Sequence, residues 1–142
     1  MWRFWSAVFV TILADQLSKL LAARFLLDKA VSVPGVLTLH YVGNPGAAFG
    51  FFANRTPFLV LVSLVLGAVV LAGYNKIKAA PVYWRWGVGL LFGGALGNLI
   101  DRLRFGYVVD FIDFSFWPVF NLADTALVCA VAVIACGVLR EK

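Results

Sequence analysis

Two aspartates with apolar neighbours are the first candidates for chemistry in this sequence. Asp110 lies in GYVVDFIDF, and Asp124 lies near the start of VFNLADTALVCAVAVIACGVL, which is otherwise apolar and long enough to cross a membrane. A carboxylate near the bilayer core costs roughly 2.5–3.5 kcal/mol on insertion scales, so Asp124 is expected to have a partner or a use. A reverse turn near Trp117 and Pro118 would bring the two carboxyl groups together.

Two carboxyl groups that lie close together in a medium of low dielectric cannot both ionise cheaply, so they share a proton. Such a pair supplies one base to activate water and one acid to protonate a leaving group. This is the chemistry of amide hydrolysis without a metal or a covalent intermediate. The alternative is that each aspartate caps a helix or pairs with an arginine, since Asp124 follows Asn121 near an expected helix start. Asp113 competes with Asp110 for the role but lies nearer the aromatic turn, and it ranks lower.

Further polar residues lie in the other apolar stretches at helical spacing. Asp15 and Lys19 are four residues apart and would share one helix face, where an ion pair would lower the cost of insertion. Either could also contact a polar substrate group or brace the site. Asn98 and Arg102 have the same spacing, and the arginine could tune the aspartates or hold a carbonyl group. The structural alternative for Asn98 is an interhelical hydrogen bond. For Arg102 it is a pair with Asp101 or snorkelling to the surface.

Small residues and a turn accompany these polar groups. In GGALGNLIDR, Gly93, Gly94 and Gly97 are expected to let a second helix approach closely. Asn44 is followed by Pro and Gly, which is typical of a turn. The functional alternative is a loop that presents the Asn44 amide to a substrate.

The composition indicates the elements that must hold these residues. Of the 142 residues, 63% are hydrophobic and 13% are charged, and the mean hydropathy is +0.93. A soluble domain is closer to half apolar and a quarter charged, so lipid must cover much of this surface. The basic residues lie at the ends of apolar segments, which favours a membrane protein over a nucleic-acid-binding protein despite a pI near 9.6. With one histidine we expect no metal site, and Cys129 and Cys136 are interpreted as small buried residues.

The sequence predicts one membrane-embedded domain over residues 1–142, an all-α integral membrane protein with four transmembrane helices. The predicted spans are 4–26, 57–74, 84–103 and 119–139. The first span resembles a signal peptide, but it has no A-x-A-like cleavage site and its apolar pattern continues past Lys19. It is therefore interpreted as a retained transmembrane helix. Alternating β-branched and aromatic residues in the two intervening segments, 28–56 and 104–120, predict short strands that pair with each other.

The distribution of charge predicts an orientation. Two crossings separate the strand-forming segments, so they should emerge on the same side of the membrane. The termini and the loop NKIKAAPVYWR lie on the other side and carry more Lys and Arg. The positive-inside rule therefore places both termini in the cytoplasm and the candidate site near the outer face.

Five motifs taken together resemble one known family: DQLSK at 15–19, NPGAAFGFF at 44–52, GGALGNLIDR at 93–102, GYVVDFIDF at 106–114 and FNLADTAL at 120–127. In order and spacing they are similar to lipoprotein signal peptidase, also called signal peptidase II. The resemblance implies an intramembrane aspartyl endopeptidase of the bacterial cytoplasmic (inner) membrane, with a small extracytoplasmic β-sheet cradle. Asp110 and Asp124 would be its catalytic pair, and the residues that bind substrate or support the site would be Asp15, Lys19, Asn44, Asn98, Arg102 and Asn121.

The same resemblance implies the substrate and the partners. The substrate would be a prolipoprotein whose lipobox cysteine carries diacylglycerol, and cleavage just before that cysteine would release the signal peptide. The expected partners are this lipidated protein and membrane lipid, with no cofactor, no metal and no nucleic acid. Because one chain supplies both aspartates, a monomer is expected to suffice.

Two other classes of function are compatible with the residues alone. Ionisable residues within a membrane also mark ion pathways, as in a transporter or a proton-conducting subunit. Against this reading, the carboxylates gather at one face and the sequence shows no internal repeat. The second alternative is a structural or assembly partner, which would use its small residues to pack against another helix and would need no pair of aspartates.

Overall fold

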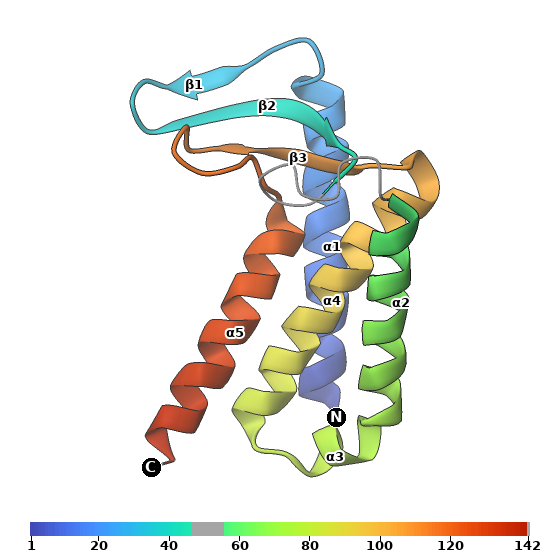
Figure 1. The fold of residues 1–142 in the computed structure, drawn as a ribbon. Coiled ribbons are helices and arrows are strands. Elements are labelled where there is room, and N and C mark those ends of the chain that lie inside the picture. The colour runs from blue at the N-terminus through green and yellow to red at the C-terminus, as the bar shows by residue number, and fades with distance from the viewer. Residues whose placement is uncertain (47–55, 142) are drawn as a thin grey trace.

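Five helices and a three-stranded sheet make up the described part of the computed structural model, which covers residues 1–46 and 56–141. The long helices run side by side, with the sheet across one end and both termini and the short helix α3 at the other end (Figure 1). The helices are α1 (Trp2–Phe25), α2 (Thr56–Ala72), α3 (Tyr74–Ala79), α4 (Val82–Phe105) and α5 (Leu122–Arg140). A long helix therefore occurs at each of the four apolar stretches.

Helix α4 packs against both α1 and α5 through its small residues. A Cβ atom on Gly93 would lie 2.8 Å from the Cβ of Thr11 in α1, and one on Gly94 would lie 2.6 Å from the carbonyl oxygen of Ala123 in α5. A Cβ on Gly97 would lie 2.6 Å from an Asp15 carboxyl oxygen. Because these separations are shorter than real Cβ contacts, only glycine permits the helices to approach this closely. The close packing predicted for this stretch is confirmed.

The outward faces of the helices are apolar. Large hydrophobic side chains are exposed on α1, α2 and α5, among them Phe9, Leu17, Leu21, Val62, Val65, Val69, Val128 and Val131. An exterior of this kind marks a surface that meets something other than water, and here it fits contact with lipid. By length and composition, α1 and α5 are the two described helices that could each cross a membrane, and α2 is a shorter apolar helix.

The sheet has the strand order β1–β2–β3, and both neighbouring pairs are antiparallel. Its strands are β1 (Val31–Val33), β2 (Leu37–Asn44) and β3 (Val108–Asp113). β2 and β3 come from the two segments predicted to form strands, so the predicted pairing of these segments is confirmed. The last pair in the register is Asn44 with Val108, which brings the end of β2 beside the start of β3.

The chain reverses direction between β3 and α5, as the sequence predicts. The backbone N–H groups of Phe111 and Ile112 donate to the Phe120 carbonyl at 3.1 and 3.0 Å, and the Phe120 N–H donates to the Ile112 carbonyl at 3.0 Å. α5 begins only at Leu122, later than the predicted 119, because Phe120 pairs with β3 and Asn121 caps the helix. This reversal sets the start of α5 directly beside β3.

Two local predictions differ from the structure. The segment NKIKAAPVYWR, interpreted as a loop, contributes most of the short helix α3, which ends before Pro81 because the residue before a proline favours an extended backbone. Cys129 and Cys136, interpreted as buried, are free thiols exposed on α5. A lipid-facing surface accepts the same small apolar side chains as a core, so composition alone does not separate the two positions.

Candidate active site

Asp110 lies within β3 and is almost completely buried, with 2% of its surface exposed. The side-chain amide of Asn121 donates to Asp110 Oδ1 at 2.7 Å, and that of Asn44 donates to Oδ2 at 2.8 Å. The Asn44 amide is itself oriented, because its oxygen accepts the backbone N–H of Gly46 at 2.9 Å. Each carboxyl oxygen of Asp110 therefore has an amide donor, one from the neighbouring strand and one from the cap of α5.

Asp124 lies in the first turn of α5 and belongs to its cap. Its backbone N–H donates to the Asn121 side chain at 2.9 Å, and its Oδ2 accepts the Asn121 backbone N–H at 3.4 Å, which together form a capping box. Its Oδ1 accepts the side-chain amide of Asn98 in α4 at 2.9 Å. The capping role considered as an alternative is confirmed for Asp124, and it fixes the direction in which the carboxylate points.

Asp110 and Asp124 line the same cavity, which has a volume of about 420 Å³. Two amides link them: Asn121 donates to Asp110 and, at 3.1 Å, to the side-chain oxygen of Asn98, which in turn donates to Asp124. Most of the remaining lining is apolar and comes from α2, α4, α5 and the segment before α5, including Leu59, Val62, Leu66, Ala95, Val119 and Val128. A largely apolar cavity with a few converging polar groups is typical of a ligand site.

Burial raises the pKa of Asp110 from 3.8 to about 6, because a low-dielectric environment disfavours the ionised carboxyl group. The hydrogen bonds from Asn44 and Asn121 and the positive charge of Lys19 oppose this increase, whereas the nearby Asp124 adds to it. A carboxyl group that is partly protonated near neutral pH can act as an acid. Asp110 is therefore suited to this role.

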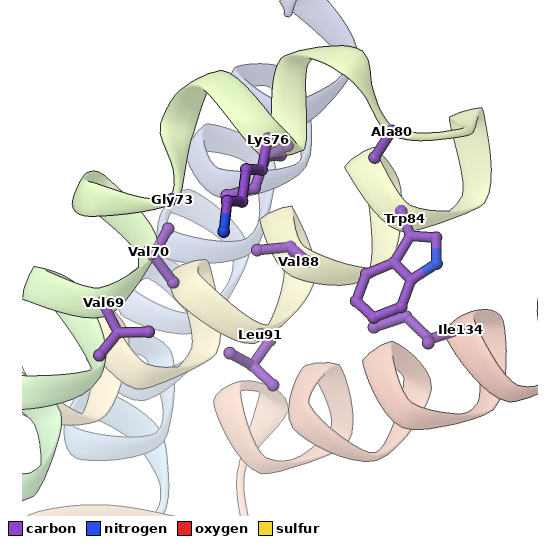
Figure 2. Close-up of a pocket in the computed structure, with 10 residues that line it drawn as sticks. Val69, Val70, Gly73, Lys76, Ala80, Trp84, Val88, Leu91 and Ile134 are labelled. Atoms are coloured by element: carbon purple, nitrogen blue, oxygen red, sulfur yellow. The ribbon is translucent and has the colours of Figure 1, made fainter.

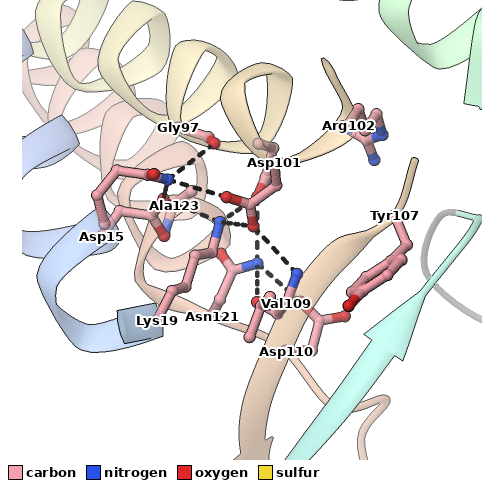
Figure 3. Close-up of polar contacts among 12 residues, drawn as sticks. Asp15, Lys19, Gly97, Asp101, Arg102, Tyr107, Val109, Asp110, Asn121 and Ala123 are labelled. Carbon is pink, nitrogen blue, oxygen red and sulfur yellow. Dashed lines mark hydrogen bonds and ion pairs between the residues drawn. The ribbon is translucent and has the colours of Figure 1, made fainter. Parts of the chain in front are cut away.

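Next to these two aspartates, Lys19 is the centre of a second, buried polar cluster (Figure 3). It forms ion pairs with Asp15 and Asp101, both at 2.9 Å, so the predicted pair between Asp15 and Lys19 is confirmed. Its ammonium group also donates to the side-chain oxygen of Asn98 at 3.0 Å. Asp15 in turn accepts the backbone N–H of Ala123 at 3.0 Å. Lys19 and Asp15 thus connect α1 to both α4 and α5 beside the cavity.

Asp101 belongs to this cluster but is not among the site residues predicted from the sequence. It is 1% exposed and accepts hydrogen bonds from the side chain of Gln16 at 3.0 Å and the backbone N–H of Val109 at 3.0 Å. Because Val109 precedes Asp110, the second bond holds β3 against α4 beside the candidate catalytic residue. A signal was available, since Asp101 lies three residues after Asn98 on one helix face.

Arg102 lines the cavity together with the two aspartates. Its Nη2 donates to the carbonyl of Gly46 at 3.4 Å. Within residues 1–46 and 56–141 it forms no ion pair, and Asp101 is instead paired with Lys19, so the alternative of a pair between Asp101 and Arg102 is wrong. Figure 3 shows its guanidinium group apart from the Lys19 cluster.

The remaining sequence candidates lie outside this arrangement. Asp113 does not belong to the cavity lining, and its carboxyl oxygens contact His40 Nδ1 at 3.9 Å and the backbone N–H of Ser115 at 2.7 Å. This geometry agrees with ranking Asp113 below Asp110. Residues 47–52 of the motif NPGAAFGFF lie outside the described residues. In the part of the chain that is described, no group of three or more His, Cys, Asp or Glu side chains could hold a metal ion.

The protein has apolar helices around a cavity that contains a buried carboxyl group, and a small sheet covers one end of the helices. These features indicate its class, a helical membrane protein. Two solved structures of bacterial membrane enzymes, obtained by the in meso method at 2.3 and 1.9 Å resolution, match this fold with TM-scores of 0.83 and 0.82, each at 29% sequence identity. The matches cover 95% and 96% of this chain and 86% and 92% of the solved chains.

The sequence comparisons identify the family. The profile of Peptidase_A8, described as signal peptidase (SPase) II, matches residues 7–140. The lipoprotein signal peptidase of Pelotomaculum thermopropionicum is 46% identical over 136 residues, which are 94% of this chain and 89% of that protein. The lipoprotein signal peptidase of Moorella thermoacetica is 48% identical over 122 residues, which are 84% and 81% of the two chains. The chain belongs to the signal peptidase II family, and the resemblance inferred from the five motifs is confirmed.

Proposed function

We propose that this protein is an intramembrane aspartyl endopeptidase that removes the signal peptide from diacylglyceryl-modified prolipoproteins. Membership of the signal peptidase II family and the relatives named lipoprotein signal peptidase support this activity. One observation carries the catalytic assignment: the carboxyl groups of Asp110 and Asp124 line one cavity and are linked through the amides of Asn98 and Asn121.

In the proposed reaction, a water molecule is held between the two carboxyl groups. Ionised Asp124 takes a proton from the water as its oxygen attacks the carbonyl carbon before the lipidated cysteine, and protonated Asp110 donates a proton to the carbonyl oxygen. When the C–N bond breaks, Asp124 gives its proton to the departing nitrogen and Asp110 takes back a proton from a hydroxyl of the tetrahedral intermediate. This leaves a carboxyl end on the signal peptide and a free amine on the cysteine. The pKa of about 6 for Asp110 supports its role as the acid, because part of this carboxyl group is protonated near neutral pH.

The other site residues are proposed to orient the two aspartates or the substrate. The guanidinium group of Arg102 lies at the cavity, and its one described hydrogen bond goes to the Gly46 carbonyl. This group is therefore suited to hold a substrate carbonyl oxygen. Asn44 donates to Asp110 and therefore positions a carboxyl group, in addition to making the expected turn. The positioning residues in this proposal are Asn44, Asn98, Asn121, Asp15 and Lys19.

The shape of the cavity supports a substrate that stays anchored in lipid. Val62 of α2 and Val128 of α5 line the cavity and are also 48% and 69% exposed, so the cavity reaches the apolar exterior of the molecule. A diacylglyceryl-modified cysteine could therefore approach the aspartates from the side, with its acyl chains remaining in the bilayer. No cofactor is part of this proposal.

We further propose that α1, α2, α4 and α5 cross a bacterial inner membrane as one domain, with both termini in the cytoplasm and the aspartates near the outer face. Both termini and α3 lie at the end of the molecule opposite the sheet (Figure 1), and the basic residues described at that end are Arg3, Lys76, Lys78, Arg85 and Arg140. One chain supplies both Asp110 and Asp124, so a monomer is proposed to suffice. A proton pathway has less support, because the buried ionisable residues gather at the sheet end instead of following the helices through the membrane.

The proposal is tested by cleavage of a diacylglyceryl-modified prolipoprotein by the purified protein in detergent, with a metal chelator present. We expect wild type to cut and Asp124→Asn to lose at least about 100-fold in turnover, since the variant cannot act as a base. Asp113→Asn is the matched control: it removes a carboxylate that lies outside the cavity lining and should retain most of the activity.

Each result has a consequence for the assignment. Retained turnover in a folded Asp124→Asn variant would overturn the catalytic pair while leaving the peptidase class intact. If wild type itself does not cut a substrate that is verified to be lipidated, the proposed activity is wrong, and proton flux in liposomes becomes the next measurement.

A further inference from the structure

A second cavity lies at the end of the helix bundle opposite the candidate active site. It has a volume of about 420 Å³ and is bordered by α2, α3, α4 and α5. Most of its lining is apolar, including Val69, Val70, Val88, Leu91 and Ile134 (Figure 2). This cavity, called the α3 groove below, contains none of the residues assigned to peptide cleavage.

Lys76 is the one charged side chain in the described lining of the α3 groove. Figure 2 shows its side chain directed toward the apolar lining, in the direction of Val70 and Val88. Among residues 1–46 and 56–141 no carboxylate lies within ion-pair distance of its ammonium group. The described carboxylate at this end of the molecule, Glu141, accepts the hydroxyl of Tyr83 at 2.7 Å instead. Lys76 is exposed, so its ammonium group is accessible to an anion, and the apolar lining beside it is accessible to the apolar part of the same molecule.

In the membrane orientation proposed above, the groove lies at the level of the lipid headgroups. Trp84 lines it and is 39% exposed, and tryptophan is enriched at the boundary between membrane and water. The same end of the molecule carries the basic residues Arg3, Lys78, Arg85 and Arg140. Along α4, the groove extends from Trp84 to Leu91, which corresponds to about 10 Å of helix. The groove therefore combines one basic side chain, Lys76, with an apolar lining that extends along α4.

We propose that the α3 groove binds one anionic phospholipid, with its phosphate group at Lys76 and part of an acyl chain against Val70, Val88 and Leu91. Basic pockets between membrane helices are known to select lipids with anionic headgroups. A signal peptide does not fit this site, because its amino-terminal region is positively charged and would be repelled by Lys76. The proposal adds a lipid site to the protein and does not depend on which residues cleave the peptide bond.

Native mass spectrometry of the purified protein in detergent tests this site with two lipids that carry identical acyl chains, phosphatidylglycerol and phosphatidylcholine. We expect wild type to retain phosphatidylglycerol preferentially. Lys76→Gln should weaken the binding of phosphatidylglycerol about fivefold, because one basic residue near an anionic lipid contributes an effect of this size. Lys76→Arg keeps the positive charge and should restore the binding. Lys78→Gln is the matched control, because it removes the same charge from the same short helix outside the groove lining, and it should bind like wild type.

A second variant tests the apolar half of the site without changing charge. Ala80→Phe places a ring in the groove and should reduce retention of phosphatidylglycerol even though Lys76 is present. Equal losses in Lys76→Gln and Lys78→Gln would mean diffuse attraction and would overturn the proposal. Equal retention of both lipids by wild type, or displacement of the lipid by inorganic phosphate alone, would overturn it as well.

Discussion

At the level of single residues, the carboxyl groups in and beside the cavity differ in what compensates their charge. Asp15 and Asp101 share the ammonium group of Lys19, whereas Asp110 and Asp124 accept hydrogen bonds from uncharged amides. An amide compensates the burial of a negative charge less than a cation does. For Asp110 the two amides leave the pKa raised to about 6, so part of this carboxyl group holds a proton near neutral pH.

The raised pKa of Asp110 predicts how stability depends on pH. Its pKa is about 6 in the folded protein against a reference value of 3.8, so folding favours the protonated form. The contribution of Asp110 to stability is fully present below about pH 4 and is lost as pH rises through about 6. The difference, 6 − 3.8 or roughly two units, corresponds to about 3 kcal/mol.

Thermal unfolding of the protein in detergent between about pH 4 and pH 7 measures this contribution. Wild type should lose stability with rising pH more steeply than Asp110→Asn, in which the group does not titrate. Parallel curves for the two proteins would contradict the raised pKa.

At the level of elements, α4 is the helix that joins the parts of the site. Its glycines allow close contact with α1 and α5, and the same helix carries Asn98, Asp101 and Arg102. The close contact brings the short side chains of Asp15 and Asn98 within hydrogen-bond distance of α5. Gly94 is the sharpest case, since a Cβ atom would meet the Ala123 carbonyl in the first turn of α5, the turn that contains Asp124.

Gly94→Ala should therefore destabilise the protein by about 1–3 kcal/mol, the usual cost of overpacking, and should reduce cleavage because α5 is pushed away from α4. Gly67→Ala in α2 is the matched control: its Cβ would lie at an ordinary 3.5 Å from Phe92, and removing a helical glycine should be neutral or stabilising by about 0.5–1 kcal/mol. Unfolding midpoints and cleavage rates of both variants provide the comparison. Equal effects would show that close packing at Gly94 is not required.

At the level of the whole molecule, the two ends are chemically different. The sheet end carries the buried polar cluster and the carboxyl pair, and the other end carries both termini, α3 and the α3 groove (Figure 1). This difference agrees with a protein that acts on a substrate at one membrane surface and is held by charge at the other.

The proposed orientation predicts which engineered cysteines react with a membrane-impermeant maleimide in intact cells. Val36→Cys, in the exposed turn between β1 and β2, should be labelled, whereas Lys78→Cys in α3 should react only after the membrane is permeabilised. Wild type is the control, because Cys129 and Cys136 lie on the lipid-facing surface proposed for α5 and should remain unlabelled. Labelling of Lys78→Cys alone in intact cells would reverse the orientation.

The sequence by itself determined the features that depend on residue type and short spacing. Composition established the membrane class, and the presence of a carboxylate in an apolar stretch selected Asp124 as a candidate catalytic residue. Asp15 and Lys19 were paired correctly because residues four apart share a helix face. Alternating β-branched residues located β2 and β3, and the five motifs together identified the family.

Only the tertiary structure decided which partner each polar group has. The partner of Asp101 is Lys19 and not Arg102, Asn121 connects Asp110 to Asn98, and the cap at Asn121 delays the start of α5. These contacts join side chains that are far apart in the chain, 79 residues for Lys19 with Asn98 and 66 for Asn44 with Asp110. Local spacing specifies which residues share a helix face, but the close packing of α1, α4 and α5 specifies which faces meet.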